Sequence, residues 1–138
     1  MLQQALSIDE IALGKEHATV ATDLNNLAEA GRMLGRYSQA EQYYRRALLI
    51  DTKVLGPEAL GVATDLNNLA VLYFDQGKYD DAEPLLRRAL AIREQALGPD
   101  NPELAPTLDN FAIFLRALGK TDEATEIEAR AKNLHGKN

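Results

Sequence analysis

Residues that could carry out acid–base or nucleophilic chemistry are few in this chain and are scattered along it. The two histidines are His17 and His135, and there is no cysteine to act as a nucleophile or as a metal ligand. Asp23 and Asp65 recur 42 residues apart near the expected beginnings of helices, where a carboxylate also complements the helix dipole. The sequence contains no glycine-rich phosphate loop and no metal-ligand spacing. We therefore expect no catalytic site, no metal and no cofactor.

Amide side chains form a more informative pattern. The heptapeptide TDLNNLA occurs as Thr22–Ala28 and again as Thr64–Ala70, so that Asn25 and Asn67 occupy equivalent positions. An asparagine side chain carries both a donor and an acceptor, and it can therefore hold the C=O and N–H groups of an extended peptide. The alternative is that these asparagines only stabilise the stacking of neighbouring repeats. The sequence leaves both interpretations open.

The two heptapeptides belong to a longer repeated unit. Small residues recur every 42 residues, at Gly35, Gly77 and Gly119, at Ala40, Ala82 and Ala124, and at Ala47, Ala89 and Ala131. This spacing predicts one repeat domain over residues 1–138. We divide it into a partial repeat at 1–13 and three repeats at 18–55, 60–97 and 102–134, the last of them acting as a cap.

Each repeat has the pattern of two helices. In the second repeat, the spacing i, i+3, i+4, i+7 that marks one face of a helix is followed by Leu66, Leu69, Ala70 and Tyr73. We expect this helix to cover residues 62–76 and to end at Gly77, because glycine readily adopts the left-handed conformation found at helix ends. Asp80 or Asp81 should cap the next helix, and Ser38 its counterpart in the first repeat. The expected fold is all-α, a right-handed superhelical solenoid of antiparallel helix pairs.

Several longer motifs point to a known family. They are LNNLA at Leu24–Ala28 and Leu66–Ala70, GKYDDAE at Gly77–Glu83, RRAL at Arg87–Leu90 and ALGPDNP at Ala96–Pro102. With these motifs the chain resembles a tetratricopeptide repeat protein, in the longer version found in kinesin light chains and many bacterial relatives. The resemblance implies a groove that binds short peptide segments of cargo proteins. It also implies that the first asparagine of LNNLA and a later basic residue of the same helix contribute to binding.

Stacked helix pairs curve, so that the first helix of each pair lines a concave surface. Rotation by one position from the buried stripe predicts the peptide-binding residues on this surface: Asn25, Glu29, Arg32, Asn67, Val71, Phe74, Asp109 and Arg116. Met33, Asp75 and Ile113 belong to the same face. The resemblance assigns peptide contacts to four of these residues, Asn25, Asn67, Arg32 and Arg116.

Two positions depart from the family pattern. Asp109 occupies the place of a third asparagine, and Phe74 occupies the place of another arginine. The asparagines that follow the groove positions, Asn26, Asn68 and Asn110, are expected to bond to a neighbouring helix.

The two ends of the array differ from its middle. Residues 1–13 align with the second helix of a repeat and lack a first-helix partner, so Leu2, Leu6 and Leu13 are candidates for self-association. At the other end, Thr121 and Glu128 replace aromatic or apolar residues of the earlier repeats. Polar residues at stacking positions are typical of a capping repeat.

The composition limits the possible partners. A chain of 138 residues with 46% hydrophobic and 26% charged residues has the balance of a folded protein. Its net charge of −6 argues against nucleic acid, whose binding needs clustered Lys and Arg. No stretch approaches the roughly 18 apolar residues of a membrane span, and the start of the chain does not resemble a secretory signal. We expect a cytoplasmic protein.

These observations predict a non-catalytic scaffold for protein–protein interaction, which binds an extended peptide segment of a protein partner in its concave groove. The alternative is a self-assembling module that forms a homodimer or a larger oligomer through the N-terminal helix. Because an asparagine that holds a main chain does not read side chains, the sequence of the bound peptide cannot be predicted.

Overall fold

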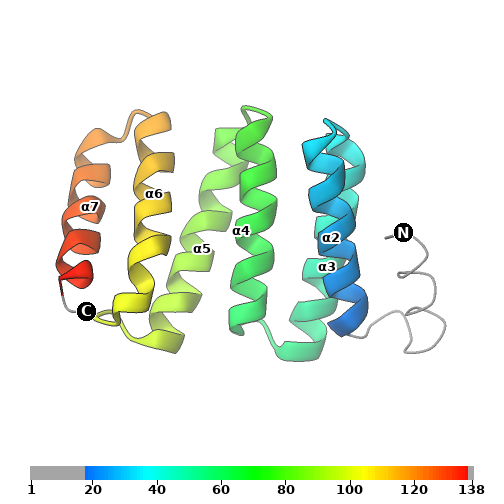
Figure 1. Cartoon of the computed structure of the whole chain (residues 1–138), viewed down its shortest axis with the longest axis horizontal. Helices are drawn as coiled ribbons and strands as arrows, with labels where there is room; N and C mark the ends of the chain where they lie inside the picture. Colours follow the sequence, from blue (N-terminus) through cyan, green and yellow to red (C-terminus); the bar gives the residue numbers. More distant parts are fainter. Residues whose placement is uncertain (1–17, 137–138) are drawn as a thin grey trace.

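The computed structural model describes residues 18–136, which form six α-helices and one short 3₁₀ helix (Figure 1). In chain order they are α2 (Ala18–Met33), α3 (Tyr37–Leu55), α4 (Leu60–Asp75), α5 (Tyr79–Leu97), η1 (Pro102–Leu104), α6 (Ala105–Ala117) and α7 (Thr121–His135). Within these residues there is no β-strand. The predicted all-α class is confirmed.

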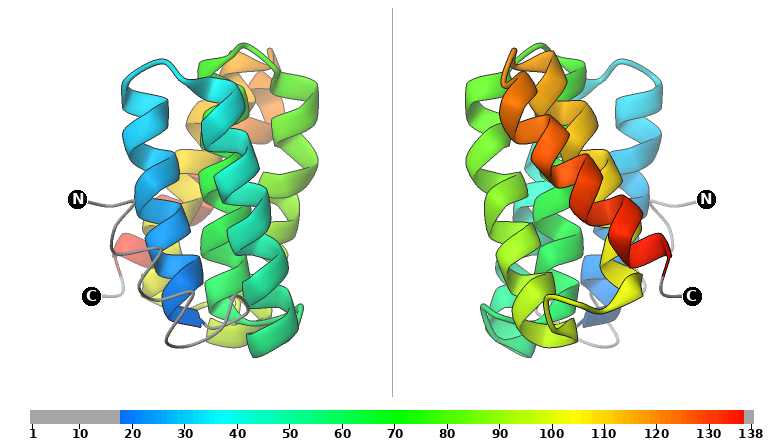
Figure 2. Two further views of the ribbon diagram at one scale, coloured as in Figure 1. Left: turned by 90° about the vertical axis from the view of Figure 1, so that its right-hand side faces the viewer. Right: turned by 90° about the vertical axis from the view of Figure 1, so that its left-hand side faces the viewer.

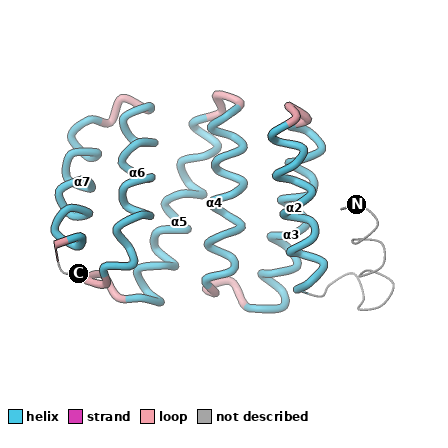
Figure 3. The backbone as a smooth tube through the Cα atoms, viewed as in Figure 1, coloured by secondary structure: helices cyan, strands magenta, loops and turns pink. Residues whose placement is uncertain are grey.

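The helices form three antiparallel pairs, α2 with α3, α4 with α5 and α6 with α7, each joined by a tight turn (Figure 3). Helix α4 begins two residues before the predicted start and ends one residue before the predicted end. Its predicted stripe is buried, and Leu66 and Ala70 have no exposed surface. Apolar burial therefore fixes which face of the helix turns inward.

The turn after α4 shows why the next helix starts where it does. Gly77 has a φ of +76°, as predicted for a left-handed helix end. The N–H of Gly77 donates to the carbonyl of Phe74 (3.0 Å), and the N–H of Lys78 donates to that of Tyr73 (2.8 Å). These two hydrogen bonds close the helix and direct the chain straight into α5.

The predicted side-chain caps are wrong. Helices α3 and α5 begin at Tyr37 and Tyr79, and neither has a side-chain hydrogen bond at its start. Ser38, Asp80 and Asp81 lie inside the first turn instead. Because the glycine turn already sets the direction of the chain, the helices start earlier than a polar cap would require.

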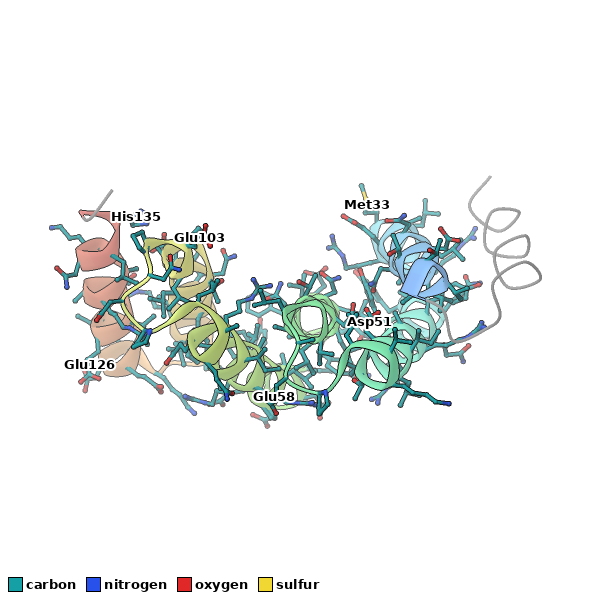
Figure 4. All side chains as sticks on the ribbon, turned by 90° about the horizontal axis from the view of Figure 1, so that it is seen from below. Met33, Asp51, Glu58, Glu103, Glu126 and His135 are labelled. Atoms are coloured by element: carbon teal, nitrogen blue, oxygen red, sulfur yellow. The ribbon has the colours of Figure 1, made fainter. Side chains whose placement is uncertain are left out.

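The three pairs stand in a row that is bent to one side. Seen along the helices, α2, α4 and α6 lie on the inner side of the bend, and α3 and α5 lie on the outer side (Figure 4). The end views show the two layers (Figure 2). Where the helices of a pair approach, both contribute small buried residues: Ala28 and Ala40, Ala70 and Ala82, Ala112 and Ala124. Small side chains allow the helices to pack closely.

The joints between the pairs are not alike. Helix α3 packs along α4, whereas α5 approaches α6 at only a few positions, and η1 fills part of that joint. Arg87 of α5 crosses this joint: its two terminal nitrogens bind the carboxylate of Glu123 (2.8 and 2.9 Å), and its guanidinium lies over the ring of Phe111 (5.3 Å). Lys120 binds Glu83 across the same joint (2.6 Å).

The joint between the first and second pairs contains two buried carboxyl groups. Asp65 of α4 is 1% exposed and Asp51 of α3 is 8% exposed. The side-chain amide of Asn25 donates to Asp65 (2.8 Å), and Asp51 lies within hydrogen-bonding reach of the same carboxyl group. Burial, and then the hydrogen bond with Asp51, raise the pKa of Asp65 to about 8. At neutral pH the Asp65 carboxyl group therefore keeps its proton.

The proton on Asp65 should make the stability of the fold depend on pH. The folded chain holds a proton on Asp65 up to about pH 8, whereas the unfolded chain releases it near pH 4. The contribution of Asp65 to the free energy of unfolding should be greatest below pH 4 and fall by about 1 kcal/mol per pH unit up to pH 8. In Asp65→Asn this slope should disappear, and the melting temperature at pH 8 should rise, as followed by circular dichroism.

The window between pH 5 and pH 8 isolates this effect. The ion-paired Glu83 and Glu123 have lowered pKa values, so their contribution is lost only as the pH falls below about 4.5. The exposed Asp80→Asn serves as a control and should keep the wild-type slope. If the melting temperatures of wild type and Asp65→Asn change in parallel across this window, the buried Asp65 does not hold a proton there.

A second prediction concerns the left-handed turn at Gly77. A Cβ added there would meet no atom within 4 Å, so the cost of Gly77→Ala is that of the backbone conformation alone. We expect a loss of about 1 kcal/mol in the free energy of unfolding, measured by urea denaturation. Gly136→Ala is the matched control, because Gly136 has an ordinary helical φ of −68° and should tolerate the methyl group. An equal loss in both variants would refute this account of the turn.

Candidate functional site

The inner side of the bend contains a pocket of about 240 Å³ between α4 and α6. Its floor comes from α5, and its walls come from the two inner helices. The lining residues are Asn67, Ala70, Val71, Phe74, Leu86, Asn110, Ile113 and Phe114.

The pocket combines an apolar interior with amide groups. Ala70 and Phe114 are buried, whereas Val71 and Ile113 are 37% and 64% exposed. Large apolar side chains with that much exposure mark surfaces that contact other molecules. None of the described lining residues is charged.

Aromatic packing fixes one wall of the pocket. The ring of Phe74 lies 5.0 Å from that of Tyr79 and 5.6 Å from that of Phe114, centroid to centroid, with tilted planes. Such tilted contacts are favourable for aromatic rings. The wall therefore exists before anything binds.

The predicted groove residues fall into two groups. Three of them, Asn67, Val71 and Phe74, come together in the pocket. Asn110, which the sequence suggested would bond to a neighbouring helix, is exposed and lines the pocket as well. Phe74 is half-buried and belongs to the wall, because it packs on Tyr79 and Phe114.

Asn25 is placed differently from its counterpart Asn67. Its amide nitrogen donates to the buried Asp65, and its Oδ1 is buried without a hydrogen-bond partner. One interpretation of the sequence is that this asparagine only stabilises the stacking of neighbouring repeats. In the structure, Asp65 is its partner in such a role. Asn25 ties the first pair to the second, and one N–H of its amide is engaged by Asp65.

Arg32 and Glu29 also lie on α2. Arg32 binds Asp75 of α4 (2.7 Å), and the hydrogen bond with Asp75 raises the pKa of the guanidinium. The nearby Tyr44 hydroxyl also favours the charged form of Arg32 and adds to this rise in its pKa. The carboxylate of Glu29 lies 4.0 Å from Arg32, and its side chain is 61% exposed. Arg32 therefore bridges two helix pairs.

The two predicted charged residues of α6 have partners on α7. Arg116 binds Glu128, with its Nε at 3.0 Å from the carboxylate. This hydrogen bond raises the pKa of Arg116 and lowers that of Glu128. The Nε2 of His135 lies 3.0 Å from the carboxylate of Asp109. Both groups are thus engaged within the last helix pair.

Besides Asn110 and Ile113, three pocket residues were not among the predicted site residues. Ala70 and Leu86 were assigned to the buried stripes of their helices, and Phe114 was not singled out. A signal was present at Leu86, because the equivalent residue 42 positions earlier is the larger Tyr44. A change from tyrosine to leucine at a stacking position removes a ring and leaves space.

Leu2, Leu6 and Leu13, the residues predicted for self-association, lie outside the described residues. Among residues 18–136 there is no group of three or more His, Cys, Asp or Glu side chains placed to hold a metal ion. None of the helices in this part of the chain is long and apolar enough to cross a membrane.

Comparison with known proteins identifies the repeat. The family model described as tetratricopeptide repeat matches three overlapping stretches, residues 1–53, 24–95 and 61–135. No curated protein is similar enough to the chain to count as a relative.

Two solved structures have the same arrangement of helices. BtubC (BKLC) from P. vanneervenii is 32% identical, with a TM-score of 0.89 over 99% of this chain and 54% of that one. A putative kinesin light chain from Podosopora anserina, with nearly identical TPR-like repeats, is 24% identical, with a TM-score of 0.80 over 99% of this chain and 64% of that one. The chain spans about half the length of BtubC.

The repeated glycine turns, the small residues within each pair and the stacking of three pairs agree with these matches over nearly the whole chain. The protein belongs to the tetratricopeptide repeat family.

Proposed function

We propose that this protein is a non-catalytic scaffold that binds an extended segment of a partner protein along its concave surface. Tetratricopeptide repeats generally mediate protein–protein interaction, and proteins built from them are generally not catalysts. The observation that carries the proposal is the pocket between α4 and α6, where amide groups stand beside exposed apolar side chains.

The amides and the apolar groups have complementary tasks. Asn67 and Asn110 come from different helices and line the same pocket, so a peptide that crosses it can exchange hydrogen bonds with both. Val71 and Ile113 offer apolar surface that a ligand would remove from water. An extended peptide presents both kinds of group, because its main chain is polar and its side chains alternate in direction.

The net charge of −6 supports a protein partner rather than a nucleic acid. The match to the tetratricopeptide repeat family supports the same class of partner, since these repeats generally mediate protein–protein interaction. The pairing of Arg32 and Arg116 with acidic side chains, however, leaves both predicted basic residues engaged within the protein.

A second candidate function is self-association, which the apolar residues Leu2, Leu6 and Leu13 suggest. Two apolar side chains of the first repeat, Leu34 and Leu49, are also well exposed and add to the surface available for self-association. Light scattering over a range of concentrations tests this candidate. A mass that stays at one chain would refute it.

The peptide-binding proposal makes a prediction for Asn67. Loss of one peptide hydrogen bond in Asn67→Ala should weaken binding by about 1 kcal/mol, or about fivefold. The measurement is fluorescence polarisation with peptides selected on the wild-type protein from a random library. The helix content should stay unchanged, because Asn67 lies on the open pocket.

Two further variants make the result specific. Asn25→Ala removes the hydrogen bond to Asp65, so it should lower the melting temperature and change peptide affinity less than Asn67→Ala does. Gln42→Ala alters an exposed amide on the outer helix α3 and should change neither property. Equal peptide affinity in wild type and Asn67→Ala would show that the groove assignment is wrong.

A further inference from the structure

We propose that the pocket between α4 and α6 is an anchor site for one apolar side chain of the bound peptide, in a segment with no acidic residue beside that side chain. This inference rests on the proposed function, because it specifies the ligand of the same groove.

The size of the pocket sets the size of its occupant. A volume of about 240 Å³ lies below the roughly 300–1,000 Å³ of sites that enclose a small-molecule ligand. That space accommodates one side chain such as leucine, methionine or phenylalanine, with its main chain at the rim.

The lining determines the polarity of the occupant. Ala70, Leu86 and Phe114 supply the interior, and the amides of Asn67 and Asn110 are the only polar side chains among the described lining residues. A charged group placed there would lose water without gaining an ionic partner. An apolar side chain would instead displace water from an apolar surface.

Comparison of the two joints shows that the pocket results from a local change in the repeat. The residues 42 positions before Leu86 and Phe74 are Tyr44 and Arg32. Tyr44 is 3% exposed and lies beside Arg32, which binds Asp75. The first joint is thus filled by a phenol ring and an ion pair. The second joint has a smaller leucine and a phenylalanine at these positions, and the pocket opens there.

The charges near the groove determine what can flank the anchor. Acidic groups on this surface and beside it outnumber the basic ones: Glu29, Asp75, Asp109 and Glu128 against Arg32 and Arg116. Both arginines already bind an acid of this chain. An acidic peptide would therefore find no free guanidinium at these positions and would be repelled, whereas lysine or arginine beside the anchor would be attracted.

Leu86→Tyr tests the anchor site directly. It places in the second joint the residue that the first joint already holds at the equivalent position, so the fold should tolerate it. The added ring should occupy the pocket and weaken binding of selected peptides at least tenfold. Gln95→Tyr adds the same ring at an exposed position of α5 and is the matched control.

Val71→Glu is a second test that does not depend on packing in the interior. Val71 is 37% exposed, and its counterpart in the first repeat is Glu29. The variant should fold as the wild type does. It should lower the affinity for peptides that carry an apolar anchor, because it places a carboxylate at the rim of the pocket.

The experiment uses the full chain and a displayed random dodecapeptide library, with affinities of the enriched peptides measured by fluorescence polarisation. Support requires a shared leucine, methionine or phenylalanine without neighbouring acids, a tenfold loss in Leu86→Tyr, and no loss in Gln95→Tyr. Circular dichroism confirms that each variant is folded.

The other outcomes separate the two proposals. If Asn67→Ala weakens peptide binding but Leu86→Tyr and Val71→Glu do not, the anchor site is overturned and the peptide-binding groove is still supported. Enriched peptides with acids beside the anchor would also overturn this inference. If no peptides are enriched, or if they bind all variants equally, both proposals fail. If the wild type forms a dimer that Leu86→Tyr dissociates, the occupant of the pocket is a second copy of the chain and the peptide anchor is overturned.

Discussion

Every feature of this protein depends on the stacking of helix pairs. One pair alone leaves an apolar stripe in contact with water, and the stripe becomes buried only when the next pair covers it. The close approach within each pair relies on the alanines at equivalent positions, such as Ala70 and Ala82, which have no exposed surface. Burial at these sites sets the spacing of the helices, and the spacing determines which side chains are left on the inner surface.

The two joints of the array differ at the positions where the repeats differ in sequence. The first joint contains the ring of Tyr44, the ion pair of Arg32 with Asp75, and the buried, protonated Asp65. The second joint has Leu86 and Phe74 in place of the tyrosine and the arginine, and Arg87 holds it together from the opposite layer. Two joints with the same helical framework therefore differ in chemistry, since one is closed and polar and the other is open and apolar.

Much of the fold could be predicted from the sequence, because burial and glycine geometry are local and repeat with one period. The stripe from Leu66 to Tyr73 and the turn at Gly77 follow from residue type and spacing alone. The contact partners of the polar groove residues could not be predicted in this way. Asn25 and Asn67 are identical in local sequence, yet Asn25 meets Asp65 across a joint whereas Asn67 lines open space. That difference depends on residues about 40 positions away, and a helix pattern does not encode them.

The unequal joints also have a mechanical consequence. Helix α3 packs along α4, whereas α5 touches α6 at few places, and the second joint is bridged by η1 and by the ion pairs of Arg87 and Lys120. A force along the row would therefore act at this joint on side-chain bridges rather than on one continuous helix–helix contact. The apolar pocket lies at the same joint, so a peptide bound there would add contacts between the second and third pairs.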